Sequence, residues 1–335
     1  MKKLNVLDLY KTIAAIMVIL IHVTATPVVT LKSGLAFDLL LAVNRFSKPS
    51  VPMFIFASGL ALSYSYLTKG RVFRYGEFLT RRLTRILIPY LAWCGLYYGY
   101  FVWQEIYPFD LALFFKLTAN GKMMYHLYFV VIILQFYLIF GLLLPLVRKL
   151  PGWFLLPAAM AVNLLILPVL PADLMGRSFP TYLFYFILGC YFAKDLGKAH
   201  RLVLQWKWPL MALFLGTGIL YTYQFYEDQV LGLGYRFLPD STIYLMFSAG
   251  AILVYYLWAL QIEDHGPCWI KDGMMQLSEA SFYIYLSHPA AMICAGALAV
   301  RLGITGVVDL MLVSLVGITV LVLPLSVAYA KVKGR

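Results

Sequence analysis

The sequence contains little charge for its length. Only 13% of its 335 residues are Asp, Glu, Lys or Arg, whereas 62% are hydrophobic. A soluble protein of this size needs a charged and polar shell around its core, and this chain has too few charged residues to build one. The same proportions exclude a disordered or fibrous protein. We therefore expect a lipid bilayer to solvate most of the outer surface.

Cysteine is also scarce, and the cysteines show no paired spacing. Three of the four lie inside apolar segments, which is typical of small buried residues. No CxxC motif occurs, so the sequence indicates neither a disulfide framework nor a metal site. The four residues are Cys94, Cys190, Cys268 and Cys294.

Acidic residues are fewer than basic ones. The chain has 27 Lys and Arg against 15 Asp and Glu, a formal net charge of +12. The basic residues form short clusters between apolar stretches, a pattern that orientation in a membrane explains. We therefore expect membrane lipid, and no nucleic acid, as a partner.

Long apolar segments fill most of the chain. A helix needs about 20 apolar residues to cross the hydrocarbon core of a bilayer. On this criterion we predict an all-α fold, a polytopic transmembrane bundle of about ten spans that forms one integral membrane domain over residues 1–335. Lys2 and Lys3 precede the first span without a clear cleavage motif after it, so we expect a retained helix and no signal peptide. The predicted spans are 12–31, 50–67, 86–103, 126–147, 151–169, 180–193, 208–224, 241–260, 281–300 and 307–327.

The basic residues predict the orientation of these spans. With both termini in the cytoplasm, most of the 27 Lys and Arg residues fall on the inner side, as the positive-inside rule requires. Trp103 and Tyr125 then lie at outer span ends, where aromatic belts occur. The outer connection between them contains an apolar segment over 109–116, which predicts a short amphipathic helix at the interface. The expected location is the cytoplasmic membrane.

Lys11 and His22 form the most informative pattern. They are eleven residues apart, so a helix brings both to one face, about three turns and about 16 Å apart along the axis. Asp8 extends this face and is close enough in sequence to pair with Lys11. An ionisable side chain near mid-membrane is costly, which favours a function such as a general base for His22. The alternative is a histidine that hydrogen-bonds a neighbouring helix.

Arg82 and Arg85 form a second pattern at an inner span end. They lie at i and i+3, on one helix face. Guanidinium groups there could hold the phosphates of a coenzyme. The commoner meaning of such a cluster is anchoring at anionic lipid headgroups, and this alternative stays open.

Three further segments combine polar and small residues. Residues 50–59 place Ser58 and Gly59 inside the second span, where small residues favour close helix packing. The other two segments are candidates for an acceptor or pore-lining role, with headgroup contact or hydrogen bonding between helices as the alternatives. The candidates are His126 and Tyr128 at the start of the fourth span, and Ser281, Tyr285 and His288 on one face of the ninth.

These segments, in this order, resemble the motifs of the acyltransferase-3 family of integral membrane proteins. Its opening signature is a basic residue, ten positions and then a histidine, which Lys11 and His22 match with Lys in place of the usual Arg. Later motifs of the family match Pro52–Gly59, Arg82 with Arg85, the segment from His126, and Ser281–Pro289. The resemblance extends over nearly the whole chain.

The resemblance implies an enzyme that O-acylates cell-surface sugars. It implies acyl-CoA, with acetyl-CoA the expected form, as donor substrate, no bound cofactor, and an envelope saccharide or its lipid-linked precursor as acceptor. His22 is then the catalytic histidine, and Lys11, Arg82 and Arg85 are basic residues of the acyl-CoA path. The sequence leaves open two other classes: an exporter with an intramembrane histidine proton relay, and an assembly subunit of an envelope-polymer complex.

Overall fold

Helices account for every regular element that the structure describes. The structure is a computed structural model that describes residues 5–166, 169–233 and 239–333. Seven helical stretches in these ranges are long and apolar enough to cross a membrane, and a pair of helices bent by 71° at residue 206 raises the number to eight. The expected all-α, multi-pass architecture is confirmed at this level. The count of ten spans and the orientation of the termini stay predictions.

Two of the ten expected spans form helices shorter than a bilayer is thick. The segment expected at 151–169 forms α8 (Gly152–Ile166), and the one expected at 180–193 forms α10 (Leu183–Lys194). Residues 167 and 168 lie outside the described residues. At about 1.5 Å per residue these helices are about 22 and 18 Å long, against a hydrocarbon core of about 30 Å.

The first span begins and ends earlier than the sequence indicated. Helix α1 covers Asn5–Val23 instead of 12–31, and a short helix α2 (Ala25–Thr30) follows after a turn at Thr24. Pro27 has no N–H to donate to the carbonyl of Val23 four residues earlier, so the helical ladder is interrupted there. His22 consequently lies in the last turn of α1, whereas the sequence placed it near the centre of a span.

The chain divides into two compact units. One unit combines residues 1–57 with 197–335, and the other comprises residues 58–196. The first is called the histidine unit below and the second the arginine unit, after the side chains described in the next subsection. The boundary near residue 57 falls inside one continuous helix, α4 (Ser50–Ser63).

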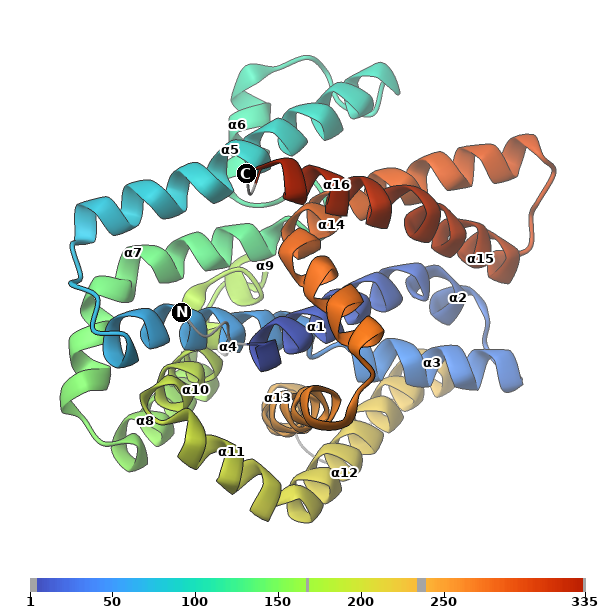
Figure 1. Ribbon diagram of the computed structural model, residues 1–335. Helices are drawn as coiled ribbons and strands as arrows, with labels where there is room; N and C mark the ends of the chain where they lie inside the picture. The colour runs from blue at the N-terminus through green and yellow to red at the C-terminus, as the bar shows by residue number, and fades with distance from the viewer. Residues whose placement is uncertain (1–4, 167–168, 234–238, 334–335) are drawn as a thin grey trace. The chain divides into compact units, whose positions relative to one another are not determined.

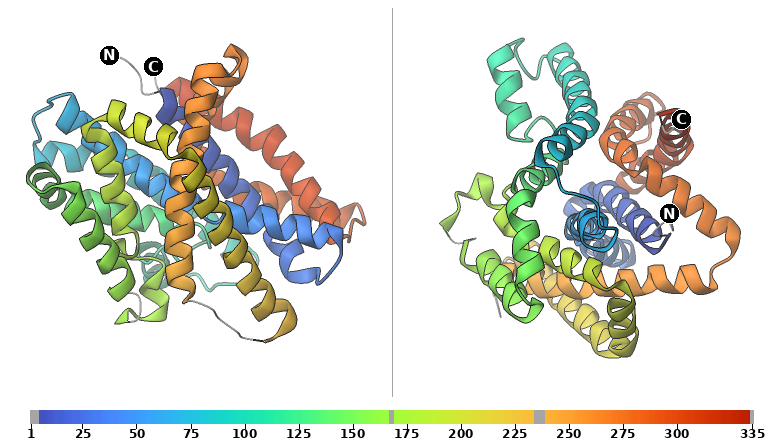
Figure 2. Two further views of the ribbon diagram at one scale, coloured as in Figure 1. Left: turned by 90° about the horizontal axis from the view of Figure 1, so that it is seen from below. Right: turned by 60° about the vertical axis from the view of Figure 1, so that its left-hand side comes forward.

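In the histidine unit, α1 packs against α13 (Asp240–His265) and α14 (Cys268–Arg301) (Figure 1). Helix α12 (Lys207–Tyr226) lies along α13 (Figure 2). Apolar side chains of α1, including Ile19 and Val23, join Ile284 of α14 in one buried cluster. The other elements of this unit are α3 (Leu35–Ser47), α11 (Leu196–Gln205), η4 (Glu227–Leu231), α15 (Val307–Gly317), η5 (Ile318–Val322) and α16 (Leu323–Lys333).

In the arginine unit, close packing of small residues confirms the interpretation of the segment around Gly59. A Cβ atom added at Gly59 would lie 2.2 Å from the carbonyl oxygen of Phe186 on α10, so no larger residue fits there without a shift of the backbone. Phe186 stacks on Phe136 with ring centroids 4.4 Å apart. The other elements are η1 (Tyr64–Thr68), α5 (Tyr75–Trp103), α6 (Leu111–Ala119), α7 (Tyr128–Lys149), α9 (Ala172–Met175) and η3 (Phe179–Tyr182).

The connection after α5 contains the short helix expected there. Helix α6 begins after Asp110, whose carboxylate accepts hydrogen bonds from the backbone N–H groups of Ala112 (2.7 Å) and Leu113 (3.3 Å). Such an N-cap satisfies donors that a helix start leaves without partners. Its position at a membrane interface stays a prediction.

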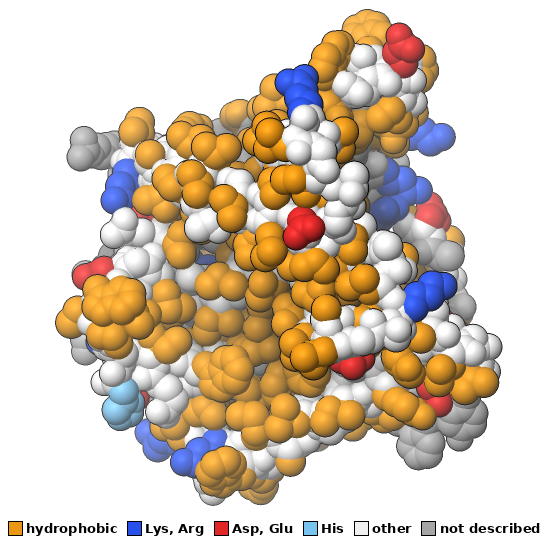
Figure 3. Space-filling view, turned by 90° about the vertical axis from the view of Figure 1, so that its right-hand side faces the viewer, with side chains coloured by type: hydrophobic (Ala, Val, Ile, Leu, Met, Phe, Trp, Pro, Cys, Tyr) orange, Lys and Arg blue, Asp and Glu red, His pale blue; other side chains and the backbone are white. Residues whose placement is uncertain are grey.

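The surface also fits a lipid environment. On the face shown in Figure 3, hydrophobic side chains cover most of the area, and charged side chains form small, separated groups. Large apolar side chains such as Leu142, Val316 and Leu325 are more than half exposed. A monomeric soluble protein rarely exposes so much continuous apolar surface.

Candidate active site

Two histidines lie side by side in the histidine unit. The imidazole rings of His22 on α1 and His288 on α14 have centroids 5.2 Å apart and planes inclined by only 26°, so the rings are stacked. His288 is fully buried, and His22 is partly exposed. The two residues are far apart in the sequence, and the packing of α1 on α14 brings them together.

Hydrogen bonds to the backbone fix the protonation pattern of His288. Its Nδ1 atom lies 2.9 Å from the carbonyl oxygen of Tyr285 and 3.2 Å from that of Ile284. A carbonyl oxygen can only accept, so Nδ1 must carry the hydrogen. In the neutral imidazole, Nε2 is then the nitrogen that holds a lone pair.

The sequence explains why this carbonyl is available to His288. In a regular helix, the N–H of residue 289 would donate to the carbonyl of Tyr285. Pro289 has no N–H, so the carbonyl of Tyr285 lacks its normal helical partner, and the imidazole of His288 replaces that partner. A histidine directly before a proline in an apolar helix is a sequence signal for this arrangement.

The end of α1 that holds His22 is tied to α3. The side-chain amide of Asn44 donates hydrogen bonds to the carbonyl of Ile21 and to the hydroxyl of Thr24, each at 3.0 Å. The hydroxyl of Thr24 itself donates to the carbonyl of Leu20 at 2.6 Å. Asn44 is buried and was not among the residues that the sequence indicated, although it is a polar side chain in an apolar segment. These bonds fix the backbone on both sides of His22.

At the other end of α1, Lys11 forms an ion pair. Its Nζ lies 2.8 Å from Oδ1 of Asp8, which confirms the pairing expected from the sequence. The hydroxyl of Ser278 on α14 donates to the same carboxylate oxygen at 2.9 Å. Because about three helical turns separate Lys11 from His22, the two side chains do not act on one atom.

The other polar residues predicted on α14 are buried but differ in their contacts. The hydroxyl of Ser281 donates to the carbonyl of Ser278 within the same helix at 2.8 Å. The ring of Tyr285 lies 6.3 Å from that of His288. The predicted polar residues are therefore buried along α14, and the hydrogen bond of Ser281 is made within that helix.

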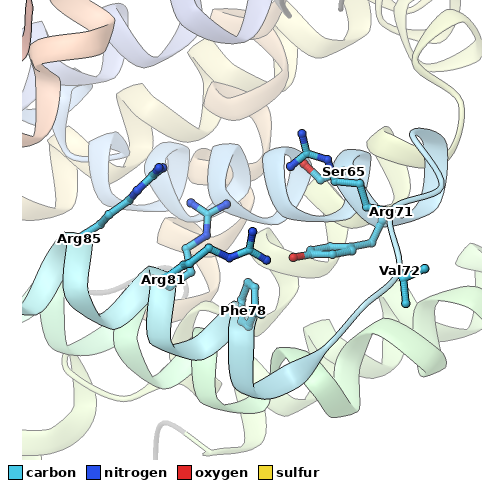
Figure 4. A pocket seen from close by; sticks show the side chains of 8 residues that line it. Ser65, Arg71, Val72, Phe78, Arg81 and Arg85 are labelled. Atoms are coloured by element: carbon cyan, nitrogen blue, oxygen red, sulfur yellow. The ribbon is translucent and has the colours of Figure 1, made fainter. Parts of the chain in front are cut away.

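The arginine unit contains a basic cavity of about 500 Å³. Arg82 and Arg85 line it, and so do Arg81 of the same helix and Arg71 of the preceding loop. Figure 4 shows the side chains of Arg81 and Arg85 extending from α5 into this space, with Arg71 and Ser65 on its other side. No Asp or Glu is among its described lining residues, so the cavity favours an anion.

A second cavity of about 530 Å³ adjoins the first one. Both are lined by Tyr66, Arg71 and Val72. The second is otherwise mainly apolar and has Arg148, near the end of α7, as a further cation. In the sequence, Arg71 and Arg148 belong to the basic residues that predict the orientation of the spans, and nothing local distinguishes them from the other residues of that group.

The two remaining predicted residues lie elsewhere in the arginine unit. His126 is buried, with its ring 5.9 Å from that of Tyr97 and 5.5 Å from that of Tyr125. Tyr128 is the first residue of α7. Neither is among the described residues that line the two cavities.

These features define a multi-pass membrane protein with a stacked imidazole pair and a basic cavity. The family model described as an acyltransferase domain, acyltransferase-3, matches residues 4–331, so the chain belongs to the acyltransferase-3 family of membrane acyltransferases. It is an enzyme that transfers acyl groups other than aminoacyl groups.

A curated relative agrees with this assignment. The chain is 27% identical over 306 residues to the "Putative membrane-bound acyltransferase YfiQ" of Bacillus subtilis (strain 168). The matched region covers 84% of this chain and 79% of that protein. No solved structure matches the chain.

Proposed function

We propose that the protein is an O-acyltransferase of the cytoplasmic membrane. It moves an acyl group, acetyl in the simplest case, from cytoplasmic acyl-CoA to a hydroxyl of a cell-surface polysaccharide or of its lipid-linked precursor. The observation that carries this proposal is the stacked pair of His22 and His288 on two apolar helices. Family membership favours the enzyme over the exporter considered from the sequence.

In this proposal His22 is the general base. Its neutral imidazole takes the proton of the acceptor hydroxyl as the oxygen attacks the carbonyl carbon of the thioester. The new C–O bond forms, the C–S bond breaks, and the coenzyme A thiolate takes the proton back from the imidazolium. His22 therefore ends each cycle in its starting state, and no further reactant is needed.

His288 acts as a positioning residue for His22. Its Nδ1–H is engaged by the backbone, which fixes the ring plane against which His22 stacks. The ring of His288 lies against one face of the His22 imidazole and restricts its orientation while it takes up and releases the proton.

The arginine-lined cavity is the proposed donor site. Arg82 and Arg85, together with Arg71 and Arg81, offer the planar, bidentate donors that phosphate groups bind best. Lys11 contributes a further cation on the donor path, held in place by Asp8. Four further residues are proposed to contact only the acceptor or neighbouring helices: His126, Tyr128, Ser281 and Tyr285.

Comparison of a wild-type and a deletion strain tests this proposal. Mass spectrometry of the surface polymer is expected to show polymer at the cell surface in both strains, with its ester groups missing in the deletion strain. Re-expression of the intact chain is expected to restore the esters, and a His22→Ala chain is not. Polymer that accumulates in the cytoplasm would instead support the exporter.

A further inference from the structure

The two cavities of the arginine unit are neighbours and together make one site with two ends. Tyr66, Arg71 and Val72 line both. Together they contain five arginines: Arg71, Arg81, Arg82, Arg85 and Arg148. None of the residues described as lining either cavity is acidic.

The two ends of this site differ in chemistry. The end next to α5 is dominated by guanidinium groups. The other end has an apolar wall, to which Phe73, Leu144 and Pro145 contribute, with Arg148 at its edge. An apolar wall that includes an aromatic ring, beside one cation, suits an aromatic base that carries a phosphate nearby.

Phe73 and Arg148 are both held in place by contacts with neighbouring residues. The ring of Phe73 contacts Tyr66, Phe78 and Phe140, with centroids 5.1 to 5.7 Å apart. Arg148 donates one hydrogen bond from Nη2 to the backbone carbonyl of Tyr66 at 3.1 Å. A guanidinium has five N–H donors, so this bond orients the group while other donors serve a ligand.

Coenzyme A has phosphates in two places that match these ends. Its pyrophosphate links the pantetheine arm to the ribose, and a separate monoester sits at the ribose 3′ position beside the adenine. A phosphate monoester carries about −1.5 to −2 charge at neutral pH. One cavity lined by four arginines and a neighbouring cavity lined by apolar residues and Arg148 provide the same kinds of group: cations for the pyrophosphate, and an apolar wall with a cation for the base and its monoester.

On the basis of the proposed function, we propose that the second cavity is a nucleotide subsite for the 3′-phosphoadenosine end of acyl-CoA. The adenine lies against Phe73 and the apolar wall, and Arg148 binds the ribose 3′-phosphate. Arg81, Arg82 and Arg85 bind the pyrophosphate. The site thereby selects acyl-CoA over acyl donors that lack the 3′-phosphate.

The test compares binding of acetyl-CoA and acetyl-3′-dephospho-CoA to the purified full-length chain. Equilibrium binding needs no acceptor, so the unidentified saccharide does not enter. Wild-type protein is expected to prefer acetyl-CoA by about tenfold or more, the usual size of a charge-assisted bond. Arg148→Gln is expected to weaken acetyl-CoA by a similar factor and to leave the dephospho form unchanged.

Arg85→Gln is the matched control, because it removes the same charge at the pyrophosphate end. It is expected to weaken both donors equally and to keep the preference between them. Arg148→Lys, which retains the charge, is expected to keep part of the preference and checks that folding is intact. Equal weakening of both donors by Arg148→Gln, or no effect on either, would overturn the subsite. Failure of the wild-type chain to bind either donor would overturn the donor site itself, and with it this subsite.

Discussion

The stacked imidazoles give the sharpest functional prediction, which concerns His288. In His288→Phe the aromatic ring remains against His22, but the N–H donor to the carbonyl of Tyr285 is lost. Because Pro289 cannot supply a replacement, a buried acceptor is left without this donor, at a cost of about 1–3 kcal/mol in stability. In His288→Ala both the ring contact and the donor are lost, and a cavity adds to the cost.

We expect kcat to fall in both variants, and to fall further in His288→Ala than in His288→Phe. With the stack retained, His288→Phe is expected to lower kcat by about tenfold, and His288→Ala by about a hundredfold; neither exceeds the lower limit of the roughly 10²–10⁴-fold that a positioned base contributes, because His22 itself remains. KM for acyl-CoA is expected to stay unchanged in both, since His288 is not among the described residues that line the proposed donor cavity. The assay is steady-state acyl transfer by purified protein, with a thermal melt for each variant.

His200 provides a control, because its replacement also removes a hydrogen bond of a histidine but lies outside the proposed site. His200 on α11 contacts the hydroxyl of Tyr256 through Nε2 at 2.8 Å, and it is not part of the proposed site. His200→Phe is expected to lower the melting temperature and leave kcat near the wild-type value. If His288→Phe also loses only stability, or if His288→Ala turns over as fast as His288→Phe, the positioning role of His288 is refuted.

Two further predictions concern the donor path and the packing. Lys11→Ala and Arg85→Ala are expected to raise KM for acyl-CoA several-fold with little change in melting temperature. Lys11→Arg is expected to keep the wild-type KM. If both alanine variants also keep the wild-type KM, these residues only anchor the helices. Gly59→Ala is expected to destabilise the chain by about 1–3 kcal/mol, because the added Cβ meets the carbonyl of Phe186, and an unchanged melting temperature would contradict that close approach.

The helical architecture could be predicted from the sequence because apolar length is a local property. Each of the ten apolar segments forms helix in the described residues. Local composition does not determine where a helix stops, and α1 shows this: Pro27 and the hydroxyl of Thr24 interrupt it within a run of apolar residues. The apolar segment at 151–169 likewise did not show that α8 has only 15 residues, whereas the segment at 180–193 was already short for a span in the sequence.

The candidate site could be predicted only in pieces. The Asp8–Lys11 ion pair lies within one helical turn, and the sequence indicated it correctly. The stacking of His288 on His22 depends on the packing of α1 against α14, which no local spacing encodes. The position of Arg148 beside Tyr66 also depends on contacts between segments that are distant in the sequence. The sequence alone therefore indicated only that Arg148 helps to orient the spans.

The most direct test of the account is acyl transfer by the purified chain with and without His22. The donor is radiolabelled acetyl-CoA, and the acceptor is surface polysaccharide extracted from a deletion strain, with no ion gradient present. We predict that wild-type protein forms labelled ester, and that His22→Ala forms none while it binds acetyl-CoA with the wild-type Kd. Ester formation by His22→Ala at a rate near that of the wild type would contradict the central claim.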